Sequence, residues 1–463
     1  MRFRTSEISV GERLVLTVLC LIVTSCAALP DVDPLIAHHA GQQANFSTAY
    51  GPVSERVNAA LLARLKDSAG ELDILDKHMA VEEAISDSPL LLGNKVTLLQ
   101  DGPQTYDALF AAIRAAQDHV NVEFYIIEDD EIGQQFADIL LERQAAGVQV
   151  NLIYDSFGCL ATPDEYFQRL QDAGVRVLEF NPVNPLDTEK EWLINNRDHR
   201  KLVIVDGQVA FLGGVNISEV YSASSLPGQD DAVDGPWRDT HMQLEGPVVG
   251  ELQKLFMDTW TRQEGEPLPE RAYFPELPAD GTEIVRAIGS TPDDEFNQIY
   301  LTLLSAIEHA ENHVYLTNAY FAPDPQFMQA LIDAAERGVD VRLILPSRTD
   351  SSLVFHAGRA KYGRLLRAGV KIYERQNVLL HSKTAVIDGV WSTVGSTNLD
   401  WRSFADNDEV NAVVLGREFA MQMLEVFEED AAASTQIDPK RWKWRSPLAR
   451  VKEIYASLWQ RLL

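Results

Sequence analysis

Two stretches of the chain carry a histidine and a lysine at the same spacing, although they lie far apart in the sequence. In both, one residue separates the histidine from the lysine, four residues separate the lysine from an aspartate, and two small residues and an asparagine follow. The first stretch contains His199, Lys201, Asp206, Gly213, Gly214 and Asn216, and the second contains His381, Lys383, Asp388, Gly395, Ser396 and Asn398. A lone His-x-Lys is commonly a surface pair, but two copies that match as far as the asparagine indicate one shared chemical task.

A phosphodiester is a substrate that needs two such groups. One neutral imidazole can attack phosphorus, while a second, protonated imidazole donates a proton to the leaving oxygen. Two lysines and two side-chain amides can hold the charge of the non-bridging oxygens. This chemistry requires no metal ion and no other cofactor, because the cationic side chains supply the charge stabilisation.

Each stretch has the pattern of a strand, a turn and a second strand. The β-branched run at 201–205 predicts a buried strand, and Asp206-Gly207 is a hairpin signal. Because side chains alternate along a strand, His199 and Lys201 point to the same side. Asp206 and Asp388 stand at the turns, where we expect them to fix the hairpins by accepting hydrogen bonds without touching phosphate.

The remaining positions of the two stretches are expected to support phosphate binding. Small residues let the backbone approach a ligand closely, and an asparagine amide can donate a hydrogen bond to a phosphate oxygen. The small residues are Gly213, Gly214, Gly395 and Ser396, and the asparagines are Asn216 and Asn398.

Together these residues resemble the duplicated HKD motif of the phospholipase D superfamily, and the resemblance spans about residues 90–463. Within the superfamily the sequence is most similar to bacterial cardiolipin synthases, through the segments 195–201, 236–241, 245–247 and 398–403. The resemblance implies a covalent phosphohistidine intermediate. It also implies that His199 is the nucleophile and His381 the general acid, although the symmetry of the motif leaves the reverse assignment open.

An acid follows each motif at the start of a strand-like run: Asp239 after the first and Glu409 after the second. A histidine nucleophile needs a defined tautomer, which a carboxylate on its other ring nitrogen can set. The resemblance implies that these two acids orient the imidazoles. The alternative is that they are ordinary surface acids at strand starts.

Strands and helices alternate from residue 90 onward, and the same order returns in the second half. The segments 116–120, 145–150 and 173–177 reappear in altered form at 310–314, 336–341 and 368–372. Repetition over so long a period indicates a duplicated domain. We therefore expect an α/β fold of two pseudo-symmetric phospholipase D-like α/β/α repeats that share one active-site cleft.

The boundaries follow from these repeats and from composition. We expect a leader at 1–26, a tether with short helices at 27–88 that includes a loop at 41–52, a first phospholipase D-like domain at 89–263, a proline-rich linker at 264–280, a second such domain at 281–435, and a basic aromatic tail at 436–463.

The N-terminus resembles a secretory leader. Arginines precede an apolar run at 14–23 that is too short to span a membrane. The segment Val23–Cys26 resembles a lipobox, at which Cys26 would be lipidated. The alternative is an uncleaved signal anchor, and both place the catalytic body at a membrane of the cell envelope, outside the cytoplasm.

Charge separates the tail from the rest of the chain. The protein has 40 basic and 69 acidic residues and a net charge of −29, which argues against nucleic acid as a partner. The tail instead interleaves basic and aromatic residues, as suits a lipid headgroup interface. It would also suit a helix packed on the second repeat, and both can hold. The three cysteines have no metal-type spacing, and we expect Cys159 to be a buried apolar residue.

The leading interpretation is a phosphatidyltransferase that converts phosphatidylglycerol to cardiolipin and glycerol. The same residues would serve a hydrolytic phospholipase D, in which water takes the place of the lipid acceptor. A nuclease or other phosphodiesterase and a non-catalytic lipid-binding scaffold are further alternatives. The expected partners are phospholipid substrates and a membrane surface, and the need for a partner protein is left open.

Overall fold

The structure is a computed structural model that describes residues 44–86, 88–184, 193–225 and 236–459, together with residues 34 and 38. The predicted leader and the predicted lipidation at Cys26 lie outside the described residues. Within these described ranges, no helix is both long enough and apolar enough to cross a membrane.

The first repeat alternates strands and helices as the sequence predicts. Its strands are β3 (Leu90–Gln100), β4 (His119–Phe124), β5 (Gln149–Asp155), β6 (Arg176–Phe180), β7 (Arg197–Asp198), β8 (Lys201–Val205), β9 (Val209–Gly213), β10 (Trp237–Arg238) and β11 (Thr240–Glu245). Its helices are α5 (Asp101–Ala115), α6 (Glu131–Ala145), α7 (Asp164–Asp172), the short 3₁₀ helix η2 (Glu219–Tyr221) and α8 (Val248–Arg262).

The second repeat follows the same order. Its strands are β12 (Glu283–Ser290), β13 (His313–Asn318), β14 (Asp340–Pro346), β15 (Lys371–Arg375), β16 (Leu379–Leu380), β17 (Lys383–Ile387), β18 (Trp391–Gly395), β19 (Asn407–Leu415) and β20 (Ser434–Gln436). Its helices are α9 (Gln298–Glu308), α10 (Pro325–Glu336), α11 (Ser352–Ala368), α12 (Trp401–Ala405) and α13 (Arg417–Ala432).

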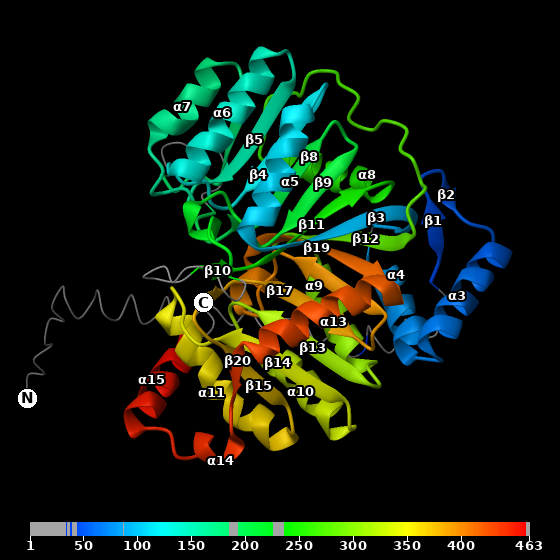
Figure 1. Ribbon diagram of the computed structural model, residues 1–463, viewed down its shortest axis with the longest axis vertical. Helices are drawn as coiled ribbons and strands as arrows, with labels where there is room; N and C mark the ends of the chain where they lie inside the picture. Colours follow the sequence, from blue (N-terminus) through cyan, green and yellow to red (C-terminus); the bar gives the residue numbers. More distant parts are fainter. Residues whose placement is uncertain are drawn as a thin grey trace, which may run out of the picture.

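One mixed sheet runs through both repeats. The strands of the first repeat are ordered β6-β5-β4-β8-β9-β11-β3, and those of the second β15-β14-β13-β17-β18-β19-β12. The repeats meet where β3 pairs antiparallel with β12. Figure 1 shows the first repeat above the second with this junction between them. The predicted fold class is therefore confirmed.

Helices pack against the sheet, and three large apolar cores of the described residues lie between helices and strands. Residues of α5, α6 and α7 pack on the first repeat, and residues of α9, α10 and α11 pack on the second. A third core contains apolar residues of α8 and α13 together with strand residues of both repeats. The two repeats therefore share an apolar interior. Burial of its side chains stabilises the packing of one repeat on the other.

The segment before the first repeat is more ordered than expected. The loop predicted at 41–52 contains β1 (Phe46–Thr48) and β2 (Gly51–Pro52), and β1 pairs in parallel with β3. The predicted short helices are present as α3 (Glu55–Ala69) and α4 (Met79–Ile85), joined by the π-helical turn η1 (Ile74–His78). The loop prediction was wrong because Phe46 is fully buried in the core of the second repeat.

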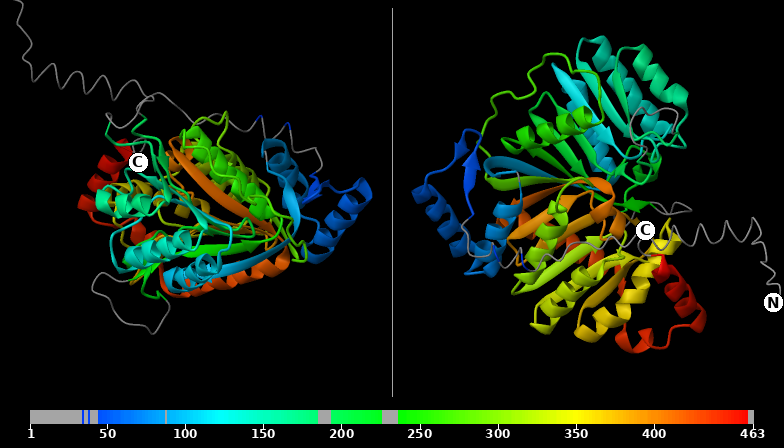
Figure 2. Two further views of the ribbon diagram at one scale, coloured as in Figure 1. Left: turned by 90° about the horizontal axis from the view of Figure 1, so that it is seen from above. Right: turned by 180° about the vertical axis from the view of Figure 1, so that it is seen from behind.

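The tail forms two helices, α14 (Pro439–Trp442) and α15 (Pro447–Leu458). Helix α15 lies along α11, as both Figure 1 and Figure 2 show. The prediction that the tail packs on the second repeat is confirmed. Between α8 and β12, the proline-rich segment 264–280 contains no helix or strand.

Candidate active site

Short strands cross between the repeats at the start of each histidine motif. The strand β7, just before His199, pairs with the beginning of β19 in the second repeat, and β16, just before His381, pairs with β10 in the first. The backbone N–H of His199 donates to the carbonyl of Asp408 (2.9 Å), and that of His381 donates to the carbonyl of Arg238 (2.7 Å). Each histidine is therefore held by the opposite repeat.

The crossing brings each imidazole to an acid of the other repeat. The Nδ1 atom of His199 lies 3.0 Å from both carboxylate oxygens of Glu409, and Nδ1 of His381 lies 2.7 Å from Oδ2 of Asp239. Both acids are fully buried. A carboxylate can only accept, so Nδ1 carries the proton and Nε2 keeps its lone pair. The alternative of surface acids is wrong.

Both histidines line one pocket of about 360 Å³. Asn216 and Asn398 line it too. Tyr125, Ile126, Arg197, Trp237, Tyr320, Asp350, Ser351, Val354, Asp400, Arg402, Ser403 and Asn407 form the rest of its wall. The two stretches of the sequence are therefore brought to a single cavity, as the duplicated pattern predicts.

The two motif lysines are fully buried and are not among the residues that line this pocket. The ammonium of Lys201 donates to the carbonyl of His199 (2.5 Å), and that of Lys383 donates to the carbonyl of His381. Each ammonium also faces an aromatic ring of the pocket wall, Lys201 at 5.1 Å from the centroid of Tyr125 and Lys383 at 6.0 Å from that of Tyr320. Such contacts hold the cations in place.

Burial sets the protonation of the site. It lowers the pKa of His199 to about 4 against the opposing effect of Glu409. Burial, together with the charge of Lys383, also lowers the pKa of His381 to about 4. Both imidazoles are therefore neutral near pH 7. Burial would raise the pKa of Glu409, but its interaction with His199 and the charge of Lys201 outweigh burial and lower that pKa to about 2, so the acid is ionised near pH 7.

The lysines titrate much closer to neutrality than lysines in water. Burial lowers the pKa of Lys201 to about 7 and that of Lys383 to about 8. The pKa of His199 is further lowered by the charges of both lysines, which shows how closely the four groups are grouped. An anion that enters the pocket favours every protonated form, so phosphate binding and proton uptake are coupled.

The two motif aspartates lie at the hairpin turns and not in the pocket. Asp206 accepts the backbone N–H groups of Gln117, Asp118 and His119. Asp388 accepts those of Glu311, Asn312 and His313 in the same way. Each ties its hairpin to the start of a parallel strand, β4 or β13. The expectation that these carboxylates fix the hairpins is confirmed.

The small residues lie against the acids that contact the imidazoles. Gly213, Gly214, Gly395 and Ser396 do not line the pocket. A side chain on Gly214 would begin 2.1 Å from Oδ1 of Asp239, and one on Gly395 would begin 2.0 Å from Oδ1 of Asn411. The hydroxyl of Ser396 donates to Glu409 (2.5 Å). These residues are small because they face the orienting acids and their strands.

Aromatic residues around the imidazoles were missed by reasoning from the sequence. The ring of Tyr125 lies 5.0 Å from that of His199, and the rings of Trp237 and Tyr320 lie 5.1 Å and 6.0 Å from that of His381. The hydroxyl of Tyr221 is 3.2 Å from Nδ1 of His381. One signal was available, because Tyr125 and Tyr320 follow equivalent parallel strands, whose carboxyl ends commonly form ligand sites.

Two arginines of the pocket were also not singled out. Arg197 is buried and lies 3.7 Å from the buried carboxylate of Asp155, whereas Arg402 is partly exposed at the pocket wall. Among the described residues, no group of three or more histidine, cysteine, aspartate or glutamate side chains could hold a metal ion.

Comparisons with known proteins agree with this geometry. The family described as "Cardiolipin synthase, PLD-like domain" matches residues 109–224 and 303–431. Cardiolipin synthase of Geobacillus kaustophilus is 35% identical over 82% of this chain and 74% of its own. Cardiolipin synthase A of Pseudomonas putida is 38% identical over 82% of this chain and 76% of its own.

A solved structure shares the fold at low sequence identity. Phosphatidylserine synthase of Haemophilus influenzae Rd KW20 superimposes with a TM-score of 0.60 and 13% identity, over 82% of this chain and 99% of its own. The two histidine motifs that meet at one pocket and the relatives at 35% and 38% identity lead to one conclusion. The chain belongs to the cardiolipin synthase family of phospholipase D-like proteins.

Proposed function

We propose that the protein is a phosphatidyltransferase that makes cardiolipin from two molecules of phosphatidylglycerol and releases glycerol. The observation that carries the proposal is the meeting of His199 and His381 in one pocket, each with its Nδ1 on a buried carboxylate. This leaves two Nε2 atoms for chemistry on one phosphorus atom. The cardiolipin synthases of the same family support the choice of lipid.

In the first half-reaction, Nε2 of His199 attacks the phosphorus of a phosphatidylglycerol headgroup. A nitrogen–phosphorus bond forms and the bond from phosphorus to the glycerol oxygen breaks. That oxygen takes a proton from Nε2 of His381, and glycerol leaves. The anionic phosphate favours the protonated form of His381, whose pKa is about 4 before substrate binds.

In the second half-reaction, a hydroxyl of another phosphatidylglycerol attacks the phosphohistidine. His381 takes the hydroxyl proton, the nitrogen–phosphorus bond breaks, and cardiolipin leaves. The enzyme returns to its starting protonation state. The lysines Lys201 and Lys383, with the amides of Asn216 and Asn398, stabilise the charge on the non-bridging oxygens in both steps.

The direct test is to incubate the purified protein with phosphatidylglycerol and separate the lipids by chromatography. Cardiolipin with glycerol is the expected outcome. Phosphatidic acid with glycerol would mean that water is the acceptor and that the protein is a hydrolytic phospholipase D. A lack of turnover of phosphatidylglycerol would refute the proposed substrate.

The assignment of the two histidines needs a separate test. The substrate is a phosphatidyl ester that is labelled in the phosphate and whose leaving group needs no proton. A variant that lacks the general acid is expected to trap this label on the nucleophile. Label on His199 in the His381→Ala variant supports the assignment. Label on His381 in the His199→Ala variant supports the reverse.

We also propose that the protein is anchored in the cell envelope as a lipoprotein. The support is the sequence of residues 1–26 alone, with its arginines, its short apolar run and the lipobox-like Val23–Cys26. Acyl labelling of the protein in cells is expected to fail in the Cys26→Ser variant. Labelling that persists in this variant would contradict acylation at Cys26.

A further inference from the structure

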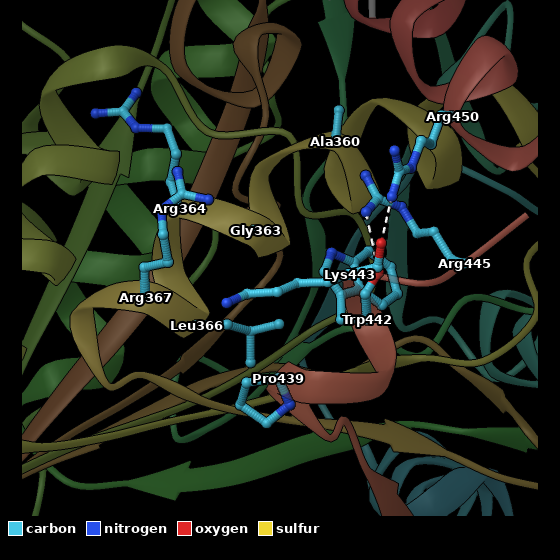
Figure 3. Close-up of a pocket in the computed structure, with 10 residues that line it drawn as sticks. All are labelled: Ala360, Gly363, Arg364, Leu366, Arg367, Pro439, Trp442, Lys443, Arg445 and Arg450. Atoms are coloured by element: carbon cyan, nitrogen blue, oxygen red, sulfur yellow. Dashed lines mark hydrogen bonds between the residues drawn. The ribbon is translucent and has the colours of Figure 1, made fainter. Parts of the chain in front are cut away.

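A second pocket, of about 530 Å³, lies away from the active site between α11 and the two tail helices. Five cationic side chains line it, as Figure 3 shows: Arg364, Arg367, Lys443, Arg445 and Arg450. In Figure 3, Arg364 and Arg367 lie to one side of Gly363, and Arg445 and Arg450 lie to the other. Gly363 itself contributes no side chain, so the space between the two groups stays open.

These cations are poorly matched by acids. Arg445 is paired with the buried Glu453 (2.6 Å) and stacks on Trp442 at 4.6 Å, so it is held in place. Arg450 donates to the backbone carbonyl of Lys443. Arg364, Arg367 and Lys443 have no ion pair in the described part of the chain. In a protein of net charge −29, such a cluster repels itself and favours an anion.

The surface beside this pocket is apolar. Helix α15 turns Glu453 and Ala456 inward, and its outward side presents exposed apolar residues. These are Leu448 (67% exposed), Val451, Ile454, Tyr455 and Leu458 (76% exposed), and Trp444 before the helix is 89% exposed. Their spacing places most of them on one stripe of the helix. A helix with exposed apolar residues beside arginine and lysine has the composition of an interfacial membrane helix.

We propose that this surface, formed by the basic pocket and the exposed side of α15, docks on a bilayer that contains anionic phospholipids. The apolar side chains enter the boundary between headgroups and acyl chains. The basic pocket receives the phosphate of an anionic headgroup. The lipid bound there does not react, because it lies outside the catalytic pocket. Charge complementarity selects this occupant, because the cluster is cationic while most of the protein is acidic.

Docking there would also place the reaction near its lipid supply. Ala456 of α15 packs in one cluster with Val354 and Ala357 of α11, and Val354 lines the active-site pocket. A single helix, α11, therefore separates the docking surface from the catalytic cavity. The catalytic pocket and the docking surface share a wall but no cation.

The test measures docking without turnover. The full-length His199→Ala protein is mixed with vesicles of phosphatidylcholine, with or without phosphatidic acid, whose acyl chains carry bromine. Bromine quenches indoles that enter the bilayer, and the Trp444→Phe variant identifies the contribution of that residue. Quenching of Trp444 is expected only with phosphatidic acid and is expected to weaken with added salt.

The charge is tested by a triple reversal, Arg364→Glu, Arg367→Glu and Lys443→Glu. It is expected to weaken the affinity for anionic vesicles by more than about tenfold. The matched control is Arg56→Glu, Arg64→Glu and Arg114→Glu, which reverses three exposed, unpaired cations elsewhere in the described chain and keeps the same net charge. Equal losses in the two variants, or no loss in either, would overturn the proposal.

The apolar side is tested by Leu448→Gln, Val451→Gln and Leu458→Gln. Membrane docking is supported if this variant loses the quenching while its sedimentation coefficient, which reports the oligomeric state, stays equal to that of the unsubstituted protein. A second copy of the chain as the occupant predicts instead a dimer that these changes dissociate, with vesicle binding unchanged, and that result would refute the proposal. Because the readout needs no cardiolipin synthesis, its failure is distinct from failure of the proposed function.

Discussion

The catalytic pocket and the α15 surface both gather cations in an acidic protein, but they do so in opposite ways. In the catalytic pocket the cations are two fully buried lysines, with two buried acids beside them. At the α15 surface they are four arginines and one lysine, and among these five only Arg445 has an ion pair in the described residues. Buried lysines can gain or lose a proton near neutrality, whereas arginines stay charged. The first arrangement suits proton-coupled chemistry, and the second suits permanent attraction to an anionic surface.

The largest effect that separates the two regions is expected from the histidines. His199→Ala and His381→Ala are each expected to lower the rate of cardiolipin formation by about four orders of magnitude, because each removes a group that acts on phosphorus or on the leaving oxygen. The Arg364→Glu, Arg367→Glu, Lys443→Glu variant is expected to keep its rate on detergent-dispersed phosphatidylglycerol. A histidine variant that retains near-normal turnover would disprove the two-histidine mechanism.

A smaller loss is expected when the orienting acids are made neutral. Glu409→Gln and Asp239→Asn keep the shape of the site but lose the charge that fixes the Nδ1 proton. We expect turnover to fall by about two to four orders of magnitude in each. Combining Glu409→Gln with His199→Ala is expected to add little to the single histidine change, because both act on the same imidazole. Additive losses would show that the acid acts elsewhere.

The pH dependence distinguishes the two kinds of cation directly. The pKa of Lys201 is about 7 and that of Lys383 about 8, so both lose their protons as the pH rises through these values. Attraction for the anionic headgroup is lost in the same direction, and the protonated fraction of the general acid His381 also falls as the pH rises above about 4, so kcat/KM is expected to fall with rising pH and to show a further step near pH 7 to 8. Below about pH 4, protonation of His199 removes the nucleophile, and kcat/KM falls again.

The α15 surface provides the control for this profile. Vesicle binding by its arginines is expected to stay constant across the range in which kcat/KM falls. Lys201→Arg, which keeps its charge, is expected to lose the step near pH 7 even if its plateau is lower. A step that is unchanged in this variant would assign the titration to another group.

The smallest loss of activity is expected from a substitution at one of the small residues, Gly214. A methyl at Gly214 would meet the carboxylate of Asp239 at 2.1 Å, so Gly214→Ala must displace the acid that holds His381. We expect a loss of turnover of about tenfold or more, together with a destabilisation of about 1–3 kcal/mol from overpacking. Gly250→Ala, on α8 with nothing within 4 Å of the added carbon, is the matched control and is expected to keep both activity and stability.

The sequence was sufficient for the local chemistry of the site. Repetition of the histidine, lysine and asparagine positions predicted a shared pocket, and the resemblance to the phospholipase D superfamily implied that Asp239 and Glu409 orient the imidazoles. The turn position of Asp206 predicted its hydrogen bonds to backbone N–H groups. The shared pocket and the hairpin turns depend on spacing within one hairpin, which can be read from the chain.

The partners across the two repeats could not be read in the same way. His199 meets Glu409 because the two-residue strand β7 pairs with the start of β19, and strands this short have no periodicity to detect. Gly214 and Ser396 were assigned to the ligand because a small residue does not reveal which neighbour requires the space. Tyr125 and Tyr320 were missed because aromatic residues after buried strands usually belong to the core.

The strand pairs β7–β19 and β10–β16, each of which joins the two repeats, have a consequence for how such a protein can be divided. Neither half contains a complete histidine–carboxylate pair, since each imidazole contacts a carboxylate of the other half. Two fragments cut in the segment 264–280 would each be inert, and activity would return only on reassembly. For the same reason, an ancestral chain with one repeat could have built this centre only as a symmetric pair, and gene fusion would then have freed its two halves to diverge.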